Sequence, residues 1–127
     1  MKNTLVVFNY EAGRKKAVLY KQRIHKFLLK RCNKFKFTSV DEFDAEAIGE
    51  YDTVIVVGGD GTVNLVAKAV AETGKTLGII PTGTANLLAA KLGISTNLEK
   101  TLKIIDKNNT MEIDLLKVND KLCCLRL

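Results

Sequence analysis

The chain has 127 residues, of which 46% are hydrophobic and 27% charged, with a formal net charge of +6. This composition is typical of one soluble globular domain with its own core and argues against a disordered chain. No apolar run approaches the ~18 residues of a membrane span, and the first residues lack the apolar core of a signal peptide. The three cysteines, Cys32, Cys123 and Cys124, form no CxxC pair. We therefore expect reduced thiols and a cytoplasmic protein.

Hydrophobic periodicity predicts strands and helices in alternation along residues 1–109. In chain order we expect a strand at 4–9, a helix at 14–31, a strand at 35–38, a short helix at 41–49, a strand at 53–57, a helix ending near 74, a strand at 76–80, and two helices, at 85–92 and 98–105. Short connections between such elements favour parallel strands with right-handed crossovers. The predicted fold is a doubly wound, Rossmann-like α/β sheet, mostly parallel, with helices on both faces.

The pattern changes after Asn109. Residues 111–118 partly alternate, Asn119 and Asp120 are typical of a turn, and 121–127 suggest another strand. We interpret residues 110–127 as a β-hairpin that begins a second, β-rich domain not contained in this chain. The alternative is a hairpin folded back on the edge of the first sheet.

The segment from Ala12 to Val40 has ten lysines and arginines and no acid. It indicates either a solvated helix face or a site for an anionic partner, such as a membrane surface, a nucleotide or a nucleic acid. Nucleic acid ranks last, because aromatic residues are few and no binding motif is present. We expect contact with a membrane to be electrostatic alone, since no stretch is predicted to offer a free apolar face.

Three loops follow predicted strands, and they contain most of the glycines and polar residues of interest. They run from Asn9 to Gly13, from Gly58 to Thr62 and from Pro81 to Asn86. In an open parallel sheet, loops at the carboxyl ends of strands line the ligand crevice. Glycines let backbone N–H groups approach an oxyanion, and a helix N-terminus adds partial positive charge. Thr62 and Thr84 either cap their helices or donate a hydroxyl to phosphate.

Known phosphate motifs do not match the second loop. No lysine follows Gly61, which excludes a Walker loop. Asn64 stands where a dinucleotide fingerprint needs glycine or alanine, and no acid lies between Glu72 and Glu99. A structural turn without ligand stays open.

Asp60 indicates that the ligand is not a bare anion. A carboxylate repels a triphosphate unless a divalent cation lies between them, and Mg²⁺ accepts one or two carboxylates together with phosphate oxygens. We therefore expect an Mg²⁺-nucleotide site, with Asp60 near the metal directly or through water. Asn64, one turn into the following helix, would bind the loop or the nucleotide.

Two motifs resemble a known family. Gly58-Gly-Asp-Gly-Thr-Val-Asn64, followed by Gly78-Ile-Ile-Pro-Thr-Gly-Thr-Ala-Asn86, resembles the diacylglycerol kinase catalytic domain of bacterial lipid kinases, which are related to sphingosine kinases. The GGDGT core alone also occurs in NAD kinases and some phosphofructokinases. GGDGT with PxGTxN about twenty residues later is far more specific, and the resemblance covers essentially the whole chain.

The resemblance implies nucleotide contacts at matching positions, namely Asn9, Gly13, Thr38, Gly58, Gly59, Asp60, Gly61, Thr62, Asn64, Gly83, Thr84 and Asn86. Thr38, or Ser39 in the neighbouring register, matches a nucleotide-contacting threonine. Tyr10 and Ala12 replace the proline and serine of the family's first loop. Leu65 and Leu87 stand where glutamate and aspartate are common.

The implied function is ATP- and Mg²⁺-dependent phosphorylation of a lipid hydroxyl, such as that of diacylglycerol. The implied partners are a nucleotide and a lipid at an anionic membrane surface, where the protein is peripheral on the inner face. The family's general base lies in the second domain, so no catalytic residue is assigned here. An NAD kinase-like nucleotide kinase and a non-catalytic nucleotide-binding module are the alternatives, and a homodimer of a full-length parent stays open.

Overall fold

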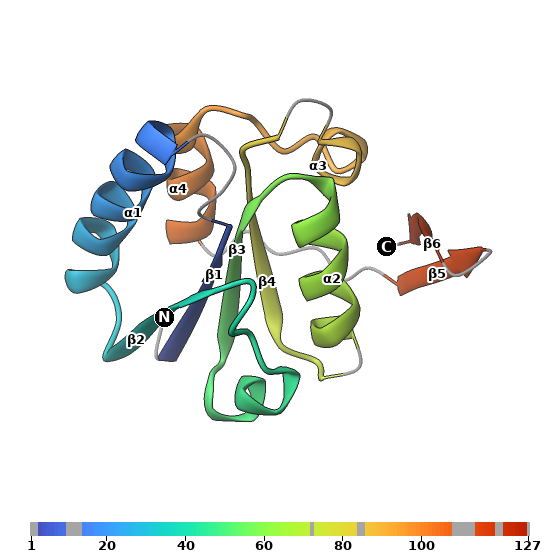
Figure 1. Ribbon diagram of the computed structural model, residues 1–127, viewed down its shortest axis with the longest axis horizontal. Coiled ribbons are helices and arrows are strands. Elements are labelled where there is room, and N and C mark those ends of the chain that lie inside the picture. The colour runs from blue at the N-terminus through green and yellow to red at the C-terminus, as the bar shows by residue number, and fades with distance from the viewer. Residues whose placement is uncertain are drawn as a thin grey trace.

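The computed structural model describes residues 3–9, 14–71, 73–83, 86–107, 114–118 and 121–126. Four parallel strands form the main sheet in the order β2-β1-β3-β4 (Figure 1). Their bounds are β1 Asn3–Phe8, β2 Lys34–Ser39, β3 Thr53–Gly58 and β4 Thr76–Pro81. The two central strands, β1 and β3, consist almost entirely of buried residues, as expected of strands covered on both faces.

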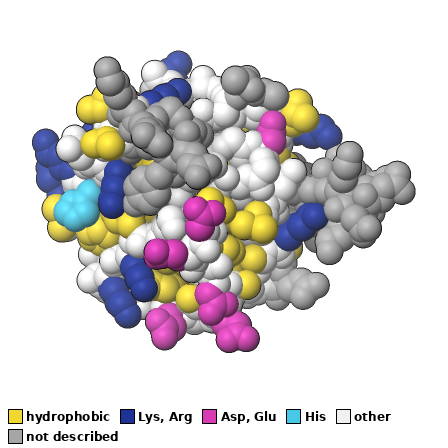
Figure 2. All heavy atoms as spheres, viewed as in Figure 1, with side chains coloured by type: hydrophobic (Ala, Val, Ile, Leu, Met, Phe, Trp, Pro, Cys, Tyr) yellow, Lys and Arg dark blue, Asp and Glu magenta, His cyan; other side chains and the backbone are white. Residues whose placement is uncertain are grey.

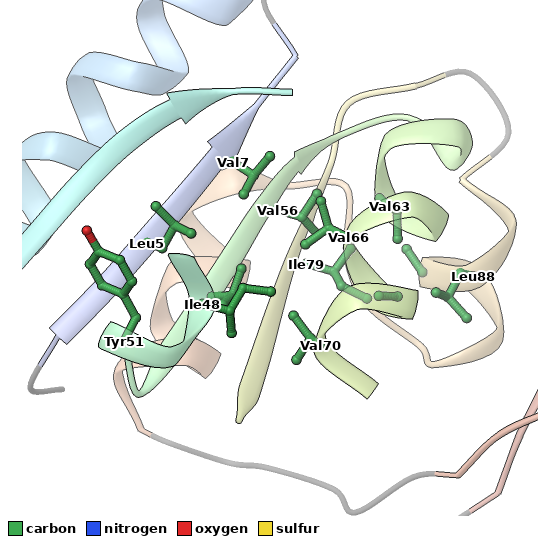
Figure 3. Close-up of a cluster of buried hydrophobic side chains, with 13 residues drawn as sticks. Leu5, Val7, Ile48, Tyr51, Val56, Val63, Val66, Val70, Ile79 and Leu88 are labelled. Atoms are coloured by element: carbon green, nitrogen blue, oxygen red, sulfur yellow. The ribbon is translucent and has the colours of Figure 1, made fainter. Parts of the chain in front are cut away.

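The helices cover both faces of this sheet. Their bounds are α1 Arg14–Leu29, α2 Asp60–Ala71, α3 Leu87–Lys91 and α4 Leu98–Asp106, with a 3₁₀ helix, η1, at Ala45–Glu50. Side chains alternate along β1, so that Leu5 and Val7 face the α2 side while Val6 and Phe8 face the α1 side. Figure 3 shows the first of these two cores, where side chains of the sheet meet those of α2, α3 and η1. The predicted parallel α/β architecture is confirmed.

One predicted helix is wrong in its position and type. Residues 41–49 were expected to form a short α-helix beginning at Asp41, whereas the structure has a 3₁₀ helix that begins after Asp44. The Asp44 carboxylate accepts a hydrogen bond from the Glu46 N–H at 3.0 Å, so this aspartate caps the helix. Ile48 is the buried residue of the turn and anchors it to the core.

Two further strands lie near the C-terminus. β5 (Asp114–Val118) and β6 (Lys121–Arg126) pair antiparallel in a sheet of their own, with a register shift between Leu116 and Lys117. Within the described residues neither strand pairs with the four-stranded sheet. The assignment of residues 110–127 to a second domain stays a prediction.

No helix in the described part of the chain is long and apolar enough to cross a membrane. Cys32 carries a free thiol whose Sγ lies 3.3 Å from Thr4 Oγ1.

Candidate functional site

The candidate site lies where three neighbouring strands end. β1, β3 and β4 are adjacent, and their carboxyl ends lie at the upper edge of the sheet in Figure 1. After β1 the chain enters α1 on one face, and after β3 it enters α2 on the other. The boundary between β1 and β3 is therefore the topological switch point, where open α/β sheets bind ligands.

Asn9 connects the two sides of this switch point. Its backbone N–H donates to the Val57 carbonyl at 3.1 Å, and its side-chain Nδ2 donates to Thr62 Oγ1 at 3.2 Å. Thr62 is only 7% exposed and is turned toward the sheet. Its hydroxyl therefore holds the first loop to the second.

Gly58 makes room for Thr62 and not for a ligand. A Cβ added at Gly58 would lie 2.8 Å from the Thr62 Cβ, closer than real contacts allow. Any side chain at residue 58 would displace Thr62 and with it the hydrogen bond from Asn9. The protein's own packing is a sufficient reason for this glycine.

The second and third loops touch backbone to backbone. A Cβ at Gly83 would lie 2.8 Å from the Gly59 Cα, and a Cβ at Gly59 would lie 3.3 Å from the Gly83 Cα. The Thr82 N–H also donates to the Gly58 carbonyl at 3.0 Å. The two glycine-containing loops thus form a single packed unit, although 24 positions separate Gly59 from Gly83.

Gly61 differs from these three glycines. It lies in the first turn of α2, and apart from its chain neighbours and the backbone of α2 itself none of the described residues comes within 4 Å of the place a Cβ would occupy. The first N–H groups of an α-helix have no partner within the helix. The N-terminus of α2, a helix of 12 residues, therefore presents free backbone donors beside an open surface at Gly61.

Asp60 is a helix residue that connects two elements. It is the first residue of α2 and is half-buried, whereas the sequence interpretation placed it in the loop from Gly58 to Thr62. Its Oδ1 accepts a hydrogen bond from the Leu87 N–H at 2.6 Å, at the start of α3. The carboxylate thereby fixes α3 against α2, and its position also adds favourable charge at the N-terminus of α2.

Asn86 closes the third loop on itself. It is a non-glycine residue in the left-handed region, with φ 51° and ψ 52°, which asparagine tolerates better than most residues. The Gly83 N–H donates to Asn86 Oδ1 at 2.9 Å, and Asn86 Nδ2 donates to the Gly83 carbonyl at 2.8 Å. This reciprocal pair fixes the loop immediately before α3.

The structure brings together most of the predicted site residues, with three qualifications. Asn64 lies half-buried one turn into α2. Thr38 lies on the outer strand β2, opposite Val7, and its hydroxyl donates to the Ser39 carbonyl at 3.4 Å. No hydrogen bond among the described residues joins Thr38 to the three loops. Gly13 and Thr84 lie outside the described residues.

The Leu87 N–H was missed by sequence reasoning. Leu87 was noted only as an apolar replacement of a family aspartate, and a backbone donor gives no signal in a sequence. The described residues contain no cluster of three or more histidine, cysteine or acidic side chains that could hold a metal. A cation at this site would therefore have Asp60 as its acidic side chain and would need other oxygen ligands from the nucleotide or water.

Comparison with known proteins agrees with this geometry. The sequence profile of the diacylglycerol kinase catalytic domain matches residues 3–118. The chain belongs to this family. It is 44% identical over 80 residues to the "Probable lipid kinase YegS" of Salmonella heidelberg (strain SL476) and, equally, to that of Salmonella schwarzengrund (strain CVM19633). Each match covers 60% of this chain and 27% of the relative.

A solved structure shows the same relationship over nearly the whole chain. The crystal structure of a diacylglycerol kinase from Bacillus anthracis strain Sterne superposes with a TM-score of 0.80 and 28% identity, covering 94% of this chain and 44% of that protein. This lipid kinase family member therefore spans about a quarter of the curated relatives it matches and under half of the solved structure.

Proposed function

We propose that this chain is the nucleotide-binding half of an ATP- and Mg²⁺-dependent lipid kinase. The observation that carries the proposal is the open N-terminus of α2 at Gly61, held in place by two loops that pack on each other through Gly59 and Gly83. Such a site supplies backbone N–H donors and a helix dipole to an anionic group. Kinase family membership implies that this group is the phosphate chain of ATP.

The residues present fit a nucleotide bound with a divalent cation. One Asp60 oxygen is used by the Leu87 N–H, and a carboxylate has two oxygens and about four acceptor positions, so it has capacity for a cation as well. Mg²⁺ prefers a site with one or two carboxylates and phosphate oxygens to a cage made of protein alone. When bound, ATP supplies the phosphoryl group for a lipid hydroxyl, and these residues bind and orient it.

The lipid acceptor is proposed from the relatives. Their printed names are lipid kinase and diacylglycerol kinase, and diacylglycerol offers one free hydroxyl as the acceptor. We place the general base in the second domain. The chain alone is therefore expected to bind Mg-ATP without phosphorylating lipid, in the cytoplasm or at the inner membrane surface.

The test is calorimetric titration of the 127-residue chain with ATP in the presence and absence of Mg²⁺. Binding that needs Mg²⁺ and weakens in Asp60→Asn supports the proposal. Asparagine keeps an oxygen for the Leu87 N–H, so this variant removes charge and retains the link between α2 and α3. Equal affinity in both proteins would show that Asp60 does not serve the metal. Absence of any ATP binding would contradict the nucleotide site itself.

An assay of radiolabelled phosphate transfer from ATP to diacylglycerol in vesicles tests whether the nucleotide site and the general base lie in different domains. Lipid phosphorylation by this chain alone, free of host kinases, would show that the base lies within residues 1–127. NAD phosphorylation by the chain would favour the NAD kinase-like alternative. Nucleotide binding without turnover in a longer native protein would favour the non-catalytic module.

A further inference from the structure

The side of α1 that faces away from the sheet is partly apolar. α1 buries Ile24, Phe27 and Leu28 against the sheet. Val18, Leu19 and Leu29 are exposed, at 54%, 64% and 61%. Val18 and Leu29 are separated by 11 residues, about three turns, so they lie on the same stripe of the helix. The expectation that the basic segment offers no free apolar face was therefore wrong.

Exposed cations and a neutral polar residue accompany these apolar side chains. Gln22, Lys26 and Lys30 are exposed, and α1 contains no acid. We define the α1 outer face by six residues: Val18, Leu19, Gln22, Lys26, Leu29 and Lys30. In Figure 2 dark-blue and yellow side chains lie together at the left edge of the molecule, over α1.

Among the described residues, two acids of α4 are paired with arginines of the α1 segment. On the neighbouring α4, Glu99 accepts hydrogen bonds from both Nε and Nη2 of Arg23 at 2.6 and 2.7 Å. Asp106 accepts from Arg31 Nε at 2.6 Å. Arg23, in α1, and Arg31, two residues after its end, are thus engaged with α4, whereas the described residues show no ion pair between α4 and Lys26 or Lys30.

Negative charge gathers elsewhere on the molecule. Residues 41–52 contain six acids and no base. They include η1, which lies toward the amino ends of the strands at the bottom of Figure 1, and most of the magenta side chains visible in Figure 2 lie in its lower half, with dark-blue ones at the lower left. An anionic surface would therefore attract the α1 outer face and repel the η1 end, which fixes one orientation of the protein.

We propose that the α1 outer face docks on an anionic lipid surface, with Val18, Leu19 and Leu29 entering the boundary between headgroups and acyl chains. Lysines beside exposed aliphatic side chains are the pattern of helices that lie in a membrane interface. The proposal extends the proposed lipid kinase function, because it states which face meets the membrane that holds the lipid. It is independent of nucleotide binding, so Mg-ATP binding without docking overturns this proposal alone.

The experiment uses the absence of tryptophan from the sequence. Leu19→Trp places a single fluorophore on the α1 outer face. Leu65→Trp is the matched control, since Leu65 is also an exposed leucine, at 50%, on a helix of the opposite layer. Each protein is mixed with vesicles of phosphatidylglycerol and phosphatidylcholine in equal parts, with or without brominated acyl chains. We expect a blue shift and quenching by bromine for Leu19→Trp and neither for Leu65→Trp.

Co-sedimentation with the same vesicles separates the charged and apolar contributions. Lys26→Glu and Lys30→Glu should each weaken binding at low salt by at least about fivefold, the loss expected for one lysine near an anionic surface. Lys75→Glu, at the amino end of β4, is the charge-matched control and should bind like the wild type. Leu19→Gln and Leu29→Gln should remove most of the binding that survives high salt.

Three results would overturn the proposal. The first is no sedimentation at low salt, which would make the α1 outer face a solvated surface. The second is sedimentation with unchanged Leu19→Trp emission, which would place the contact elsewhere. The third is a blue shift without vesicles together with a dimer mass in analytical ultracentrifugation, which would assign the face to a second copy of the chain.

Discussion

The contact between Gly59 and Gly83 predicts opposite outcomes for two glycine-to-alanine substitutions. In Gly83→Ala the new methyl group would lie 2.8 Å from the Gly59 Cα and 3.1 Å from Asn86 Oδ1. The first neighbour is backbone and cannot rotate away, so the two loops must separate. Overpacking of this kind costs roughly 1–3 kcal/mol of the free energy of unfolding.

Gly61→Ala is the matched control within the same site. Apart from its chain neighbours and the backbone of α2, none of the described residues lies within 4 Å of the added methyl group, and residue 61 is in the first turn of α2. Alanine in a helix is more stable than glycine by roughly 0.5–1 kcal/mol. The free energies of unfolding of the two variants should therefore differ by at least about 1.5 kcal/mol.

Urea unfolding followed by circular dichroism measures this difference. For a chain of 127 residues, 1 kcal/mol corresponds to a shift of roughly 4 °C in Tm, which thermal unfolding resolves. Gly61→Ala should also weaken Mg-ATP binding, because its methyl group occupies the open surface at the helix N-terminus. Equal stability of Gly83→Ala and wild type would refute the packing of the two loops. Unchanged ATP affinity in Gly61→Ala would contradict the proposal that a phosphate of ATP binds beside Gly61.

Four more outcomes follow from particular contacts. Asp60→Ala should lower stability more than Asp60→Asn, since only alanine leaves the Leu87 N–H without its acceptor; equal losses in thermal unfolding would contradict that link. Thr62→Val should lower the free energy of unfolding by about 1 kcal/mol, because it removes the acceptor of the Asn9 side chain and keeps the methyl packed on Gly58. An unchanged urea midpoint would exclude the hydrogen bond from Asn9 to Thr62. Hydrogen bonds from Arg23 hold the pKa of Glu99 below its ordinary value, so the pair stabilises the fold at neutral pH. This contribution is lost as the pH falls through the folded-state pKa of Glu99. The difference in free energy of unfolding between wild type and Glu99→Gln should therefore shrink in acid and disappear in high salt. Hydrogen exchange in β5 and β6 should be faster than in β3, because an isolated two-stranded sheet is marginal in water, and equal protection would make the hairpin integral to the first domain.

Local sequence signals predicted the strands and most helices well. β3 is a run of β-branched and apolar residues followed by glycine, and α2 repeats apolar residues at helical spacing. The 41–49 segment was misplaced because Asp41 and Asp44 are both acceptable caps, and the burial of Ile48 decides between them. A cap is local, whereas the packing that selects it is not.

The meaning of the glycines could not be read from the sequence. The glycines of the second and third loops suggested close approach of a ligand, yet Gly58 faces Thr62, and Gly59 faces Gly83 across a contact between distant segments. Among the described glycines of these two loops, Gly61 alone retains open space. For the same reason Arg23 and Arg31 were counted with the free cations of the basic segment, although their partners on α4 lie 76 and 75 residues away in the sequence. Contacts of this range come from the tertiary fold.

The most direct test of the nucleotide site is an NMR titration of the ¹⁵N-labelled chain with Mg-ATP. We predict that the largest amide shifts fall on residues 59–62 at the start of α2 and on Gly83, which packs against Gly59. Amides of the α1 outer face and of β5 and β6 should shift little. Large shifts elsewhere with unchanged amides at residues 59–62 would contradict a phosphate site at the N-terminus of α2.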